Sequence, residues 1–542
     1  MDNFVLALPT IIAAIILFAV AEYYKRQATT VSGFYVMNRG ANMWLLTGTY
    51  VASWVSITGI MGWSSLAYRQ GVAYSIWTYG LWGVLVFTFL VGLPLRRLAH
   101  YSDELVYRGE GASKSNEMAH KLLTPTDFFE LRFPNRWVRG ISSIMLVLGL
   151  LLYAVGQMMG LALAFSFLGV NFNVAVVICT LGIIWTTIRA GTPGVIVNDT
   201  INMFTFVIAA AVLIPFVLTK VGGIHNLIQV TNAMRPGLWT NLGSGSSLFT
   251  LISLNIIWNF MTAGSPHLVQ RSFTAKNEKV FLNSQILGLL IVGIWCWLQW
   301  TSATAGNILL PEISVANGDN VLPLLALATL PRILAGLVLA AIFAVGISTI
   351  NTQVSNIAFS LERDIYECLG GKKLSEEKSL RLTKIMVVAC CIAIAVFAVT
   401  YPSFISEMTS WGVAFYGACF LPMFIFGLFW QHTTTQGVLA GISAGSLLYI
   451  IFGLLKLFGI FALPNSMNPF LITMPIGVLL IVIVSLLTKQ SPEEAFVAAK
   501  VREIVKRKPE LAERATAKDY AVPIAVIVVA ITFAIVLFTF WR

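Results

Sequence analysis

A run of hydroxyl and amide side chains lies inside a strongly apolar stretch, residues 340–364. The polar set recurs at helical spacing, so most of it shares one helix face: Ser348, Asn351, Thr352 and Ser355, with Thr349 beside them. Hard cations such as sodium prefer several oxygen ligands in a small cage. This pattern therefore indicates a cavity that binds a cation without a buried formal charge.

The segment TYVASWVSITGIMGWSS, residues 49–65, is a second apolar stretch with an unusual content of small and hydroxyl residues. It contains no charged residue. Such residues permit close packing of membrane helices, which is one reading of the segment. They also weaken a helix, and an unwound turn exposes carbonyl oxygens that need a partner inside a membrane. The second reading makes the backbone of this segment a cation ligand.

A matching interruption occurs in NFMTAGSPHLVQRS, residues 259–272. Pro266 lacks a backbone N–H and disrupts the preceding helical turn, and small residues come directly before it. The two interrupted segments are five apolar segments apart. This spacing predicts two five-helix repeats of inverted topology, with a binding site where the two breaks meet near the membrane midplane.

The composition of the whole chain indicates that membrane-spanning helices position these residues. Of 542 residues, 57% are hydrophobic and 11% are charged, whereas soluble domains are about a quarter charged. The sequence is therefore that of a polytopic membrane protein embedded in the lipid bilayer. The six cysteines lack the paired spacing of a metal site and are predicted to be small core residues. The net charge of +11 points to basic loops and not to nucleic-acid binding.

Fourteen apolar runs are long enough to span a bilayer. They cover residues 4–22, 43–66, 73–94, 138–168, 172–189, 195–219, 246–270, 281–306, 329–360, 383–400, 404–430, 435–460, 467–488 and 521–541. Most of the 35 Lys and Arg residues fall in loops that follow odd-numbered runs. The positive-inside rule then places those loops in the cytoplasm and both termini outside.

The predicted organisation has five parts. They are an N-terminal extra helix with a cytoplasmic loop (1–42), a ten-helix transport core (43–430), two additional helices (431–488), a basic cytoplasmic linker or interfacial helix (489–520) and a C-terminal helix (521–542). The sequence contains no Walker, HExxH or GxSxG motif, so ATP-driven transport and standard soluble enzyme chemistry have no support. We expect a protein that is not an enzyme.

Asp199, in GVIVNDTINMFTF, is the most deeply placed carboxylate of the predicted core. Acids inside a membrane are costly and usually functional. It also lies near the predicted start of an apolar run, with Pro193 upstream, so a helix-capping role is the alternative. Glu407 lies close to a predicted membrane boundary, and His267 follows a proline at a break. Boundary and structural roles respectively suit these two residues.

The fourteen-segment plan, GSPHLVQRSFTAKNEK (264–279), VNDTINMF and VGISTINTQ together resemble the sodium/solute symporter family. That family includes bacterial proline, pantothenate, monocarboxylate and sialic acid transporters and the sodium/glucose transporters. The resemblance covers nearly the whole chain. It implies an all-α polytopic membrane protein of the LeuT-type 5+5 inverted-repeat fold. It also implies sodium-coupled import by alternating access at the bacterial inner (plasma) membrane.

The resemblance also implies ion-binding residues. Matching VASWVS and AVGIST assigns the main sodium site to backbone carbonyls and two hydroxyls: those of Ala52, Val55 and Val345, and of Ser348 and Thr349. A second ion or coupling site, found in some members, maps onto Asp199, Asn351 and Thr352. Members with two sodium ions have a hydroxyl where Asn351 stands, so the resemblance favours one ion.

Solute-binding residues follow by matched position. They are Ser56, Gly59, Tyr74, Trp77, Thr78, Trp258, Asn259, Met261, Trp411 and Tyr416. The aromatic members of this set also fit ordinary membrane packing. Trp54 stands where the proline transporters carry an acid, and the sugar transporters' polar pair is absent at Thr58 and Gly59. The GSPH motif is closer to the carboxylate and amino-acid branch.

The expected function is sodium-coupled symport of a small organic solute of carboxylate or amino-acid-like chemistry, with Na+ as the coupling ion. The expected partners are that solute and the lipid bilayer, with no nucleic acid and no obligatory protein partner. Three alternatives stay open: proton coupling through Asp199, a passive channel, and a transporter-like sensor. In such sensors the core is fused to a kinase, and this chain ends at Arg542 without one.

Overall fold

The structure is a computed structural model of the chain. It describes residues 2–26, 30–71, 82–109, 122–240, 243–244, 248–313, 315–370, 374–400, 405–461, 463, 467–508, 510, 514 and 516–540. Regular structure in these residues is helical, apart from an isolated bridge between Ala41 and Ala275. This outcome follows from the apolar composition, because a helix satisfies its backbone groups internally where water is absent.

The longer helices are α1 (Asp2–Tyr24), α3 (Met43–Ile57), α10 (Arg136–Ser166), α11 (Phe172–Val221), α12 (Ile224–Met234), α15 (Glu278–Thr304), α18 (Arg332–Phe359), α19 (Glu376–Thr400), α20 (Ile405–Phe429), α21 (Thr435–Leu457), α22 (Phe470–Leu487), α23 (Pro492–Lys506) and α24 (Ala521–Phe540). The shorter ones are α2 (Val31–Val36), η1 (Met37–Arg39), η2 (Thr58–Gly62), α4 (Trp63–Gln70), α6 (Trp82–Phe87), η3 (Thr88–Gly92), α7 (Leu93–His100), η4 (Ser102–Leu105), α9 (Pro125–Arg132), α13 (Leu248–Asn255), η5 (Ile256–Phe260), η6 (Met261–Gly264), α14 (Pro266–Ser272), α16 (Gly306–Leu309), η7 (Val315–Asn320), α17 (Val321–Thr329), η8 (Ser360–Leu369) and η11 (Ala517–Tyr520).

Within the described residues, eleven helices are long and apolar enough to cross a membrane. One of them, α11, contains two of the fourteen predicted runs in 50 residues. An unbroken helix of that length would measure about 75 Å, against about 30 Å for the hydrocarbon core. The backbone leaves helical geometry at Gly191 (φ 52°, ψ −162°), and Pro193 follows two residues later. This break divides α11 where the sequence predicts the boundary between two runs.

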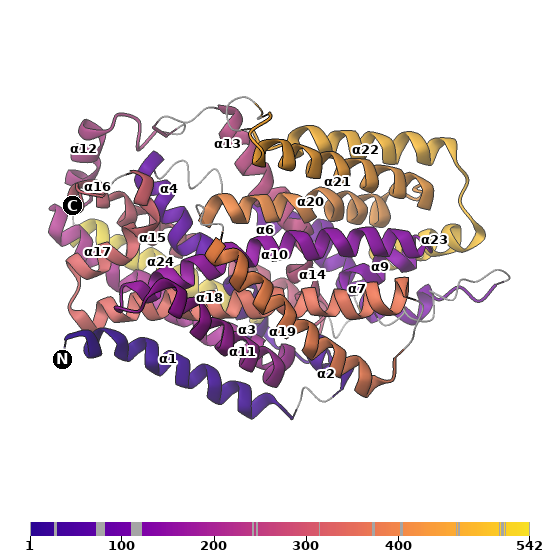
Figure 1. The fold of residues 1–542 in the computed structure, drawn as a ribbon, viewed down its shortest axis with the longest axis horizontal. Coiled ribbons are helices and arrows are strands. Elements are labelled where there is room, and N and C mark those ends of the chain that lie inside the picture. Colours follow the sequence, from indigo (N-terminus) through magenta and orange to yellow (C-terminus); the bar gives the residue numbers. More distant parts are fainter. Residues whose placement is uncertain are drawn as a thin grey trace.

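The helices form an elongated bundle (Figure 1). Helix α1 lies along one edge, where it packs on α18 and α11, and α21 packs on α22 at the opposite edge. The start of α1 and the end of α24 lie at the same end of the bundle, while α9 and α23 lie at the other. The centre contains α3, α10, α18 and α20 (Figure 1). Helices α3, α18 and α20 carry most of the predicted site.

Both predicted interruptions are present. Helix α3 leaves helical geometry at Ser56, after which the chain continues as the π-helical turn η2. The second interruption runs through η5 and the 3₁₀ turn η6, and α14 restarts at Pro266. Proline fits that first helical position because the missing N–H would have no partner there in any case.

Helix α23, in the predicted linker or interfacial segment, packs against protein. Its apolar side chains Val497, Val501 and Ile504 are buried. Its neighbours include α7, α9, η4 and α20. Arg507, directly after the helix, donates two hydrogen bonds to the carboxylate of Glu104, at 2.8 and 2.7 Å. The amphipathic pattern was visible in the sequence, but the surface that covers it was not.

Candidate sodium and solute site

Ser56 is the residue at which the first interruption occurs. Its backbone angles, φ 48° and ψ 175°, lie in a region that side-chain-bearing residues rarely adopt. Such a conformation costs about 1–3 kcal/mol and persists only where surrounding contacts impose it. The phenol of Tyr153 donates to the Ser56 hydroxyl at 3.2 Å, and Gln157 contacts the residues after the break. Both of these residues come from α10, which therefore supports the break.

The predicted main-site residues lie on α3 and α18, which pack together. Ala52 and Val55 occupy the last turn of α3 before the break, and Val345 is buried on α18. Ser348 on α18 and Thr49 on α3 each donate a short hydrogen bond to the carboxylate of Asp199 on α11. The buried acid thus joins the two helices that carry the predicted sodium ligands.

Thr349 has a side-chain oxygen without a hydrogen-bond partner in the described part of the chain. The residue is only 2% exposed. Buried hydroxyls in proteins nearly always find a partner, so an orphaned one calls for a ligand. A hydroxyl oxygen beside backbone carbonyls has the chemistry that a sodium ion requires. The described residues contain no cluster of His, Cys, Asp and Glu that could hold a metal, so neutral oxygens are the fitting donors.

Of the three residues predicted for a second ion, Asp199 and Thr352 share one partner, Arg271, whereas Asn351 has others. The guanidinium of Arg271 donates to the Thr352 hydroxyl at 2.6 Å and lies 3.5 Å from Asp199. The Asn351 amide oxygen instead accepts hydrogen bonds from Thr186 and Thr187, at 3.2 and 2.9 Å. In the described part of the chain, no hydrogen bond joins Asn351 to Asp199. The structure therefore brings Asp199 to Ser348, a predicted main-site residue, and places an arginine beside Thr352.

The two interruptions are connected by aromatic and hydroxyl side chains. Ser56, at the first break, is bonded to Tyr153, and Ser265, at the second, donates to the Tyr416 hydroxyl at 3.1 Å. The His267 ring lies between the two tyrosines, with centroid distances of 6.0 and 6.4 Å. His267 is buried, and its Nδ1 has no hydrogen-bond partner in the described residues. Two members of this cluster, Ser56 and Tyr416, are among the residues predicted to bind the solute.

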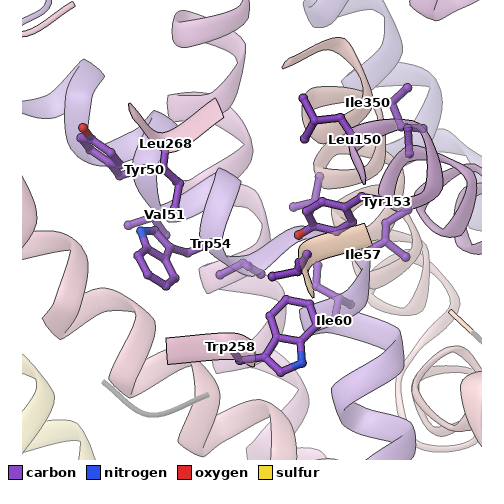
Figure 2. Close-up of a cluster of buried hydrophobic side chains, with 14 of the residues drawn as sticks. Tyr50, Val51, Trp54, Ile57, Ile60, Leu150, Tyr153, Trp258, Leu268 and Ile350 are labelled. Carbon is purple, nitrogen blue, oxygen red and sulfur yellow. The ribbon is translucent and has the colours of Figure 1, made fainter. Parts of the chain in front are cut away.

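Other predicted solute residues surround the same region. Trp258 packs edge-to-face on Trp63 at a centroid distance of 4.9 Å, and Gly59 lies against Trp63 and Trp295. Figure 2 shows Trp258 in one cluster of buried side chains with Ile57 and Tyr153.

The rest of the predicted set is spread more widely. Asn259 approaches Gly83 closely, and Met261 approaches Gly417. Trp411 points elsewhere: its ring lies against Tyr449 and Lys456 of α21. Tyr74, Trp77 and Thr78 lie outside the described residues.

Sequence reasoning missed several residues that the geometry brings to the site. They are Thr49, Tyr153, Gln157, Ser265 and Arg271. Arg271 carried the strongest available signal, because it is a basic residue directly after the predicted end of an apolar run at 270. Tyr153 and Gln157 sit in an otherwise ordinary apolar run, and nothing local to them indicates partners a hundred residues away.

A buried ionic cluster lies beyond the C-terminal end of α18. Arg139 contacts the carboxylates of Asp127, Asp364 and Glu130, all of them buried. Burial alone would raise the pKa of Asp127. Nearby Arg363 and Arg139, together with the backbone N–H groups of the two residues just before α9, outweigh this effect and hold that pKa below its usual value. The cluster ties η8, which continues α18, to α9 and α10.

Comparison with known proteins defines the class. A family model described as "Sodium:solute symporter family" matches residues 34–445. A sodium/pantothenate symporter of Haemophilus influenzae is 24% identical over 459 residues, covering 83% of this chain and 90% of that protein. Sodium/proline symporter 2 of Staphylococcus saprophyticus is 27% identical over 447 residues, covering 81% and 83%.

A solved structure has the same fold. It is a Na+-coupled sialic acid symporter in a substrate-bound, outward-open state. The TM-score is 0.72 at 21% identity, covering 91% of this chain and all of that one. The family match and the apolar helices together define a multi-pass membrane transporter. The chain belongs to the sodium:solute symporter family, in which Na+ is the coupling ion.

Proposed function

We propose that this protein imports a small organic solute of carboxylate or amino-acid-like chemistry by sodium-coupled alternating access. The observation that carries the proposal is the Ser56 break in α3 beside α18, where Thr349 has a buried hydroxyl with no hydrogen-bond partner among the described residues. Sodium would be held by the carbonyls of Ala52, Val55 and Val345 and the hydroxyls of Ser348 and Thr349.

The coupling follows from the position of this cage. It takes ligands from α3 and α18, so it is complete only when the two helices are together. An ion that binds one conformation more tightly than the other increases the population of that conformation. A solute that prefers the same conformation has the same effect. Sodium entering the cell gains about 2.3 kcal/mol per 100 mV of membrane potential, plus its concentration gradient. When sodium and the solute both bind best to the same outward-open state, the free energy released by sodium entry drives uptake of the solute.

The chemistry of the side chains between the two breaks supports a carboxylate or amino-acid-like compound. Ser56, Tyr153, Ser265, His267 and Tyr416 offer neutral hydrogen-bonding groups between the two breaks. The relatives named above carry pantothenate and proline, both of which bear a carboxylate. Trp54 stands where the proline transporters carry an acid, so proline itself is not favoured.

We also propose the membrane arrangement that the basic loops indicate: fourteen spans in a bacterial plasma membrane, with both termini outside and residues 43–430 as the inverted-repeat core. The break in α11 at Gly191 supports counting that helix as two spans. The start of α1 and the end of α24 lie at one end of the bundle, which fits an even number of spans (Figure 1).

The test is a solute screen by thermal shift on the purified protein, in sodium and in choline at fixed pH. Pantothenate, proline, acetate and sialic acid would be included with other carboxylates and amino acids. The transported solute should stabilise the protein more when sodium is present. Stabilisation that is equal in choline and depends on pH would favour the second candidate, proton coupling through Asp199. That candidate is favoured by the burial of this acid among Thr49, Ser348 and Arg271.

A further inference from the structure

The first residue after the helix break, Ile57, has an unusual backbone partner. In an uninterrupted α-helix its N–H would donate to the carbonyl of Ser53, four residues earlier. Here it donates to the side-chain Oε1 of Gln157, on α10, at 2.8 Å. A side chain from another helix has therefore replaced the intrahelical acceptor at the point where the helix opens.

Both ends of the Gln157 amide are used. Its Nε2 donates to the hydroxyl of Thr58, the next residue of the broken segment, at 2.7 Å. The backbone N–H of Ile57 can only donate, so it must face the amide oxygen, and this fixes the orientation of the amide. Gln157 is fully buried, and its amide bridges two consecutive residues of the break.

The side chain of Ile57 is held by a different contact. A Cβ atom at Gly160, one turn after Gln157 on α10, would lie 2.3 Å from Ile57 Cγ2. A Cβ at Gly346 of α18 would lie 2.4 Å from Ile57 Cδ1. The side chain thus fills a notch formed by two glycines, one of them directly after Val345. This contact fixes the position of the break relative to the face of α18 that carries Ser348 and Thr349.

We infer that Gln157 is a positioning residue for sodium binding: its amide holds the helix open after Ser56 and so sets the backbone carbonyls of α3 against the α18 hydroxyls. This inference rests on the proposed sodium site. Gln157 itself touches neither the ion nor the solute.

The expected effect follows from the cost of an unpaired buried donor. Without the amide, the Ile57 N–H either stays buried without an acceptor or returns to the Ser53 carbonyl, which closes the break. Both outcomes oppose the sodium-binding geometry, and sodium must reverse them when it binds. An unsatisfied buried group of this kind corresponds to a loss of about tenfold or more in apparent sodium affinity.

The experiment titrates sodium against the melting temperature of the full-length protein in detergent, with choline chloride holding ionic strength constant. Stabilisation grows with the ratio of sodium concentration to dissociation constant, so no solute is required. The variant is Gln157→Met, which keeps the volume and removes the amide. The matched control is Gln299→Met, because Gln299, on α15, is also a buried amide whose side chain contacts the same broken segment. It contacts Ile60 and Ser64, beyond the break.

A sodium titration shifted about tenfold in Gln157→Met, with Gln299→Met within about twofold of the parent, supports the inference. A parent-like titration in Gln157→Met overturns it and leaves the proposed function standing. An equal shift in the control also overturns it, because the effect is then general to buried amides. A parent protein with no sodium-dependent stabilisation would instead refute the proposed sodium site.

Two further variants keep the inference testable if Gln157→Met does not fold. Gln157→Asn retains an amide that is one methylene too short to reach both residues, so sodium affinity should again fall. Gln157→Glu retains an acceptor for the Ile57 N–H, and Thr58 can donate to it, so it should bind sodium far better than Gln157→Asn. The reverse order of these two variants, or equal affinities, contradicts the inference.

Discussion

The guanidinium of Arg271 lies between Asp199 and Thr352: Nη2 donates to the threonine hydroxyl at 2.6 Å and is 3.5 Å from the carboxylate. These are two of the three residues assigned by resemblance to a second ion. Arg271 is almost fully buried, so its charge is compensated by protein. A fixed positive charge opposes a second cation at the same place, as the prediction of a single coupling ion requires.

Removing one member of this pair should cost more than removing both. In Arg271→Gln, Asp199 remains buried without its cation, and breaking a buried pair in this way costs about 3–5 kcal/mol of unfolding free energy. The double variant with Asp199→Asn should recover most of that loss. Denaturant unfolding in sodium-free buffer gives the comparison, and additive losses in the double variant would contradict the pairing.

Asp199→Asn alone should slow or uncouple transport. The carboxylate joins Thr49 on α3 to Ser348 on α18, and an amide can accept from only one side. Uptake measured across a range of sodium concentrations gives the readout. Parent-like kinetics at every concentration would remove Asp199 from the coupling mechanism.

The two adjacent hydroxyls of α18 should behave differently. The Thr349 hydroxyl has no hydrogen-bond partner in the described part of the chain, so Thr349→Ala should leave sodium-free stability nearly unchanged while weakening sodium activation. Ser348→Ala should weaken both, because it removes a hydrogen bond to the Asp199 carboxylate; such bonds contribute about 1.5–3 kcal/mol. Thr349→Ser is the control, since it keeps the oxygen. Unchanged sodium dependence in Thr349→Ala would mean that its hydroxyl does not bind the ion.

Local chemistry made the breaks predictable. Ser56 lies among Ser, Thr and Gly residues, and Pro266 follows three small ones, so the sequence itself marks where a membrane helix opens. Asp199 was recognisable because a carboxylate is rare inside an apolar run. The coarse all-helical, broken-helix architecture follows from these features alone.

The partners of these residues were not predictable in the same way. Gln157 and Tyr153 act on Ser56, Ile57 and Thr58 across about a hundred residues, and their own apolar run gives no sign of it. Such contacts depend on how α10 packs beside α3, which hydrophobic periodicity does not determine.

The glycine notch around Ile57 allows a test by compensation. Gly346→Ala places a Cβ 2.4 Å from Ile57 Cδ1, which pushes the break away from α18 and should weaken sodium binding about tenfold, the range of an overpacked core site. Ile57→Val removes that terminal methyl and should restore most of the affinity in the double variant. The sodium titration of melting temperature measures all three proteins. If Ile57→Val fails to rescue, the notch does not position the break.

The pH dependence of stability tests the ionic cluster of Arg139, Asp127, Asp364 and Glu130 beyond the C-terminal end of α18. Asp127 accepts hydrogen bonds from the backbone N–H groups of Leu123 and Thr124 and from Arg139 and Arg363. These groups overcome the effect of burial and hold its folded-state pKa below the ordinary 3.8. A lowered folded-state pKa stabilises the protein fully above the unfolded value, and the stabilisation disappears as pH falls through the folded value.

The variant Asp127→Asn should therefore lose about 1.5–3 kcal/mol of unfolding free energy at pH 6, the usual contribution of hydrogen bonds to a charged group. The gap between the parent protein and this variant should narrow below about pH 3.8, because Asp127 of the unfolded parent becomes protonated there, and should close once the pH falls below its lower folded-state pKa. The measurement is the unfolding free energy of the parent protein and of Asp127→Asn from pH 6 to pH 2.5. A gap that stays constant over this range would mean that the ionised form of Asp127 is not favoured by the fold, and that the cluster holds η8 to α9 and α10 through Asp364 and Glu130 alone.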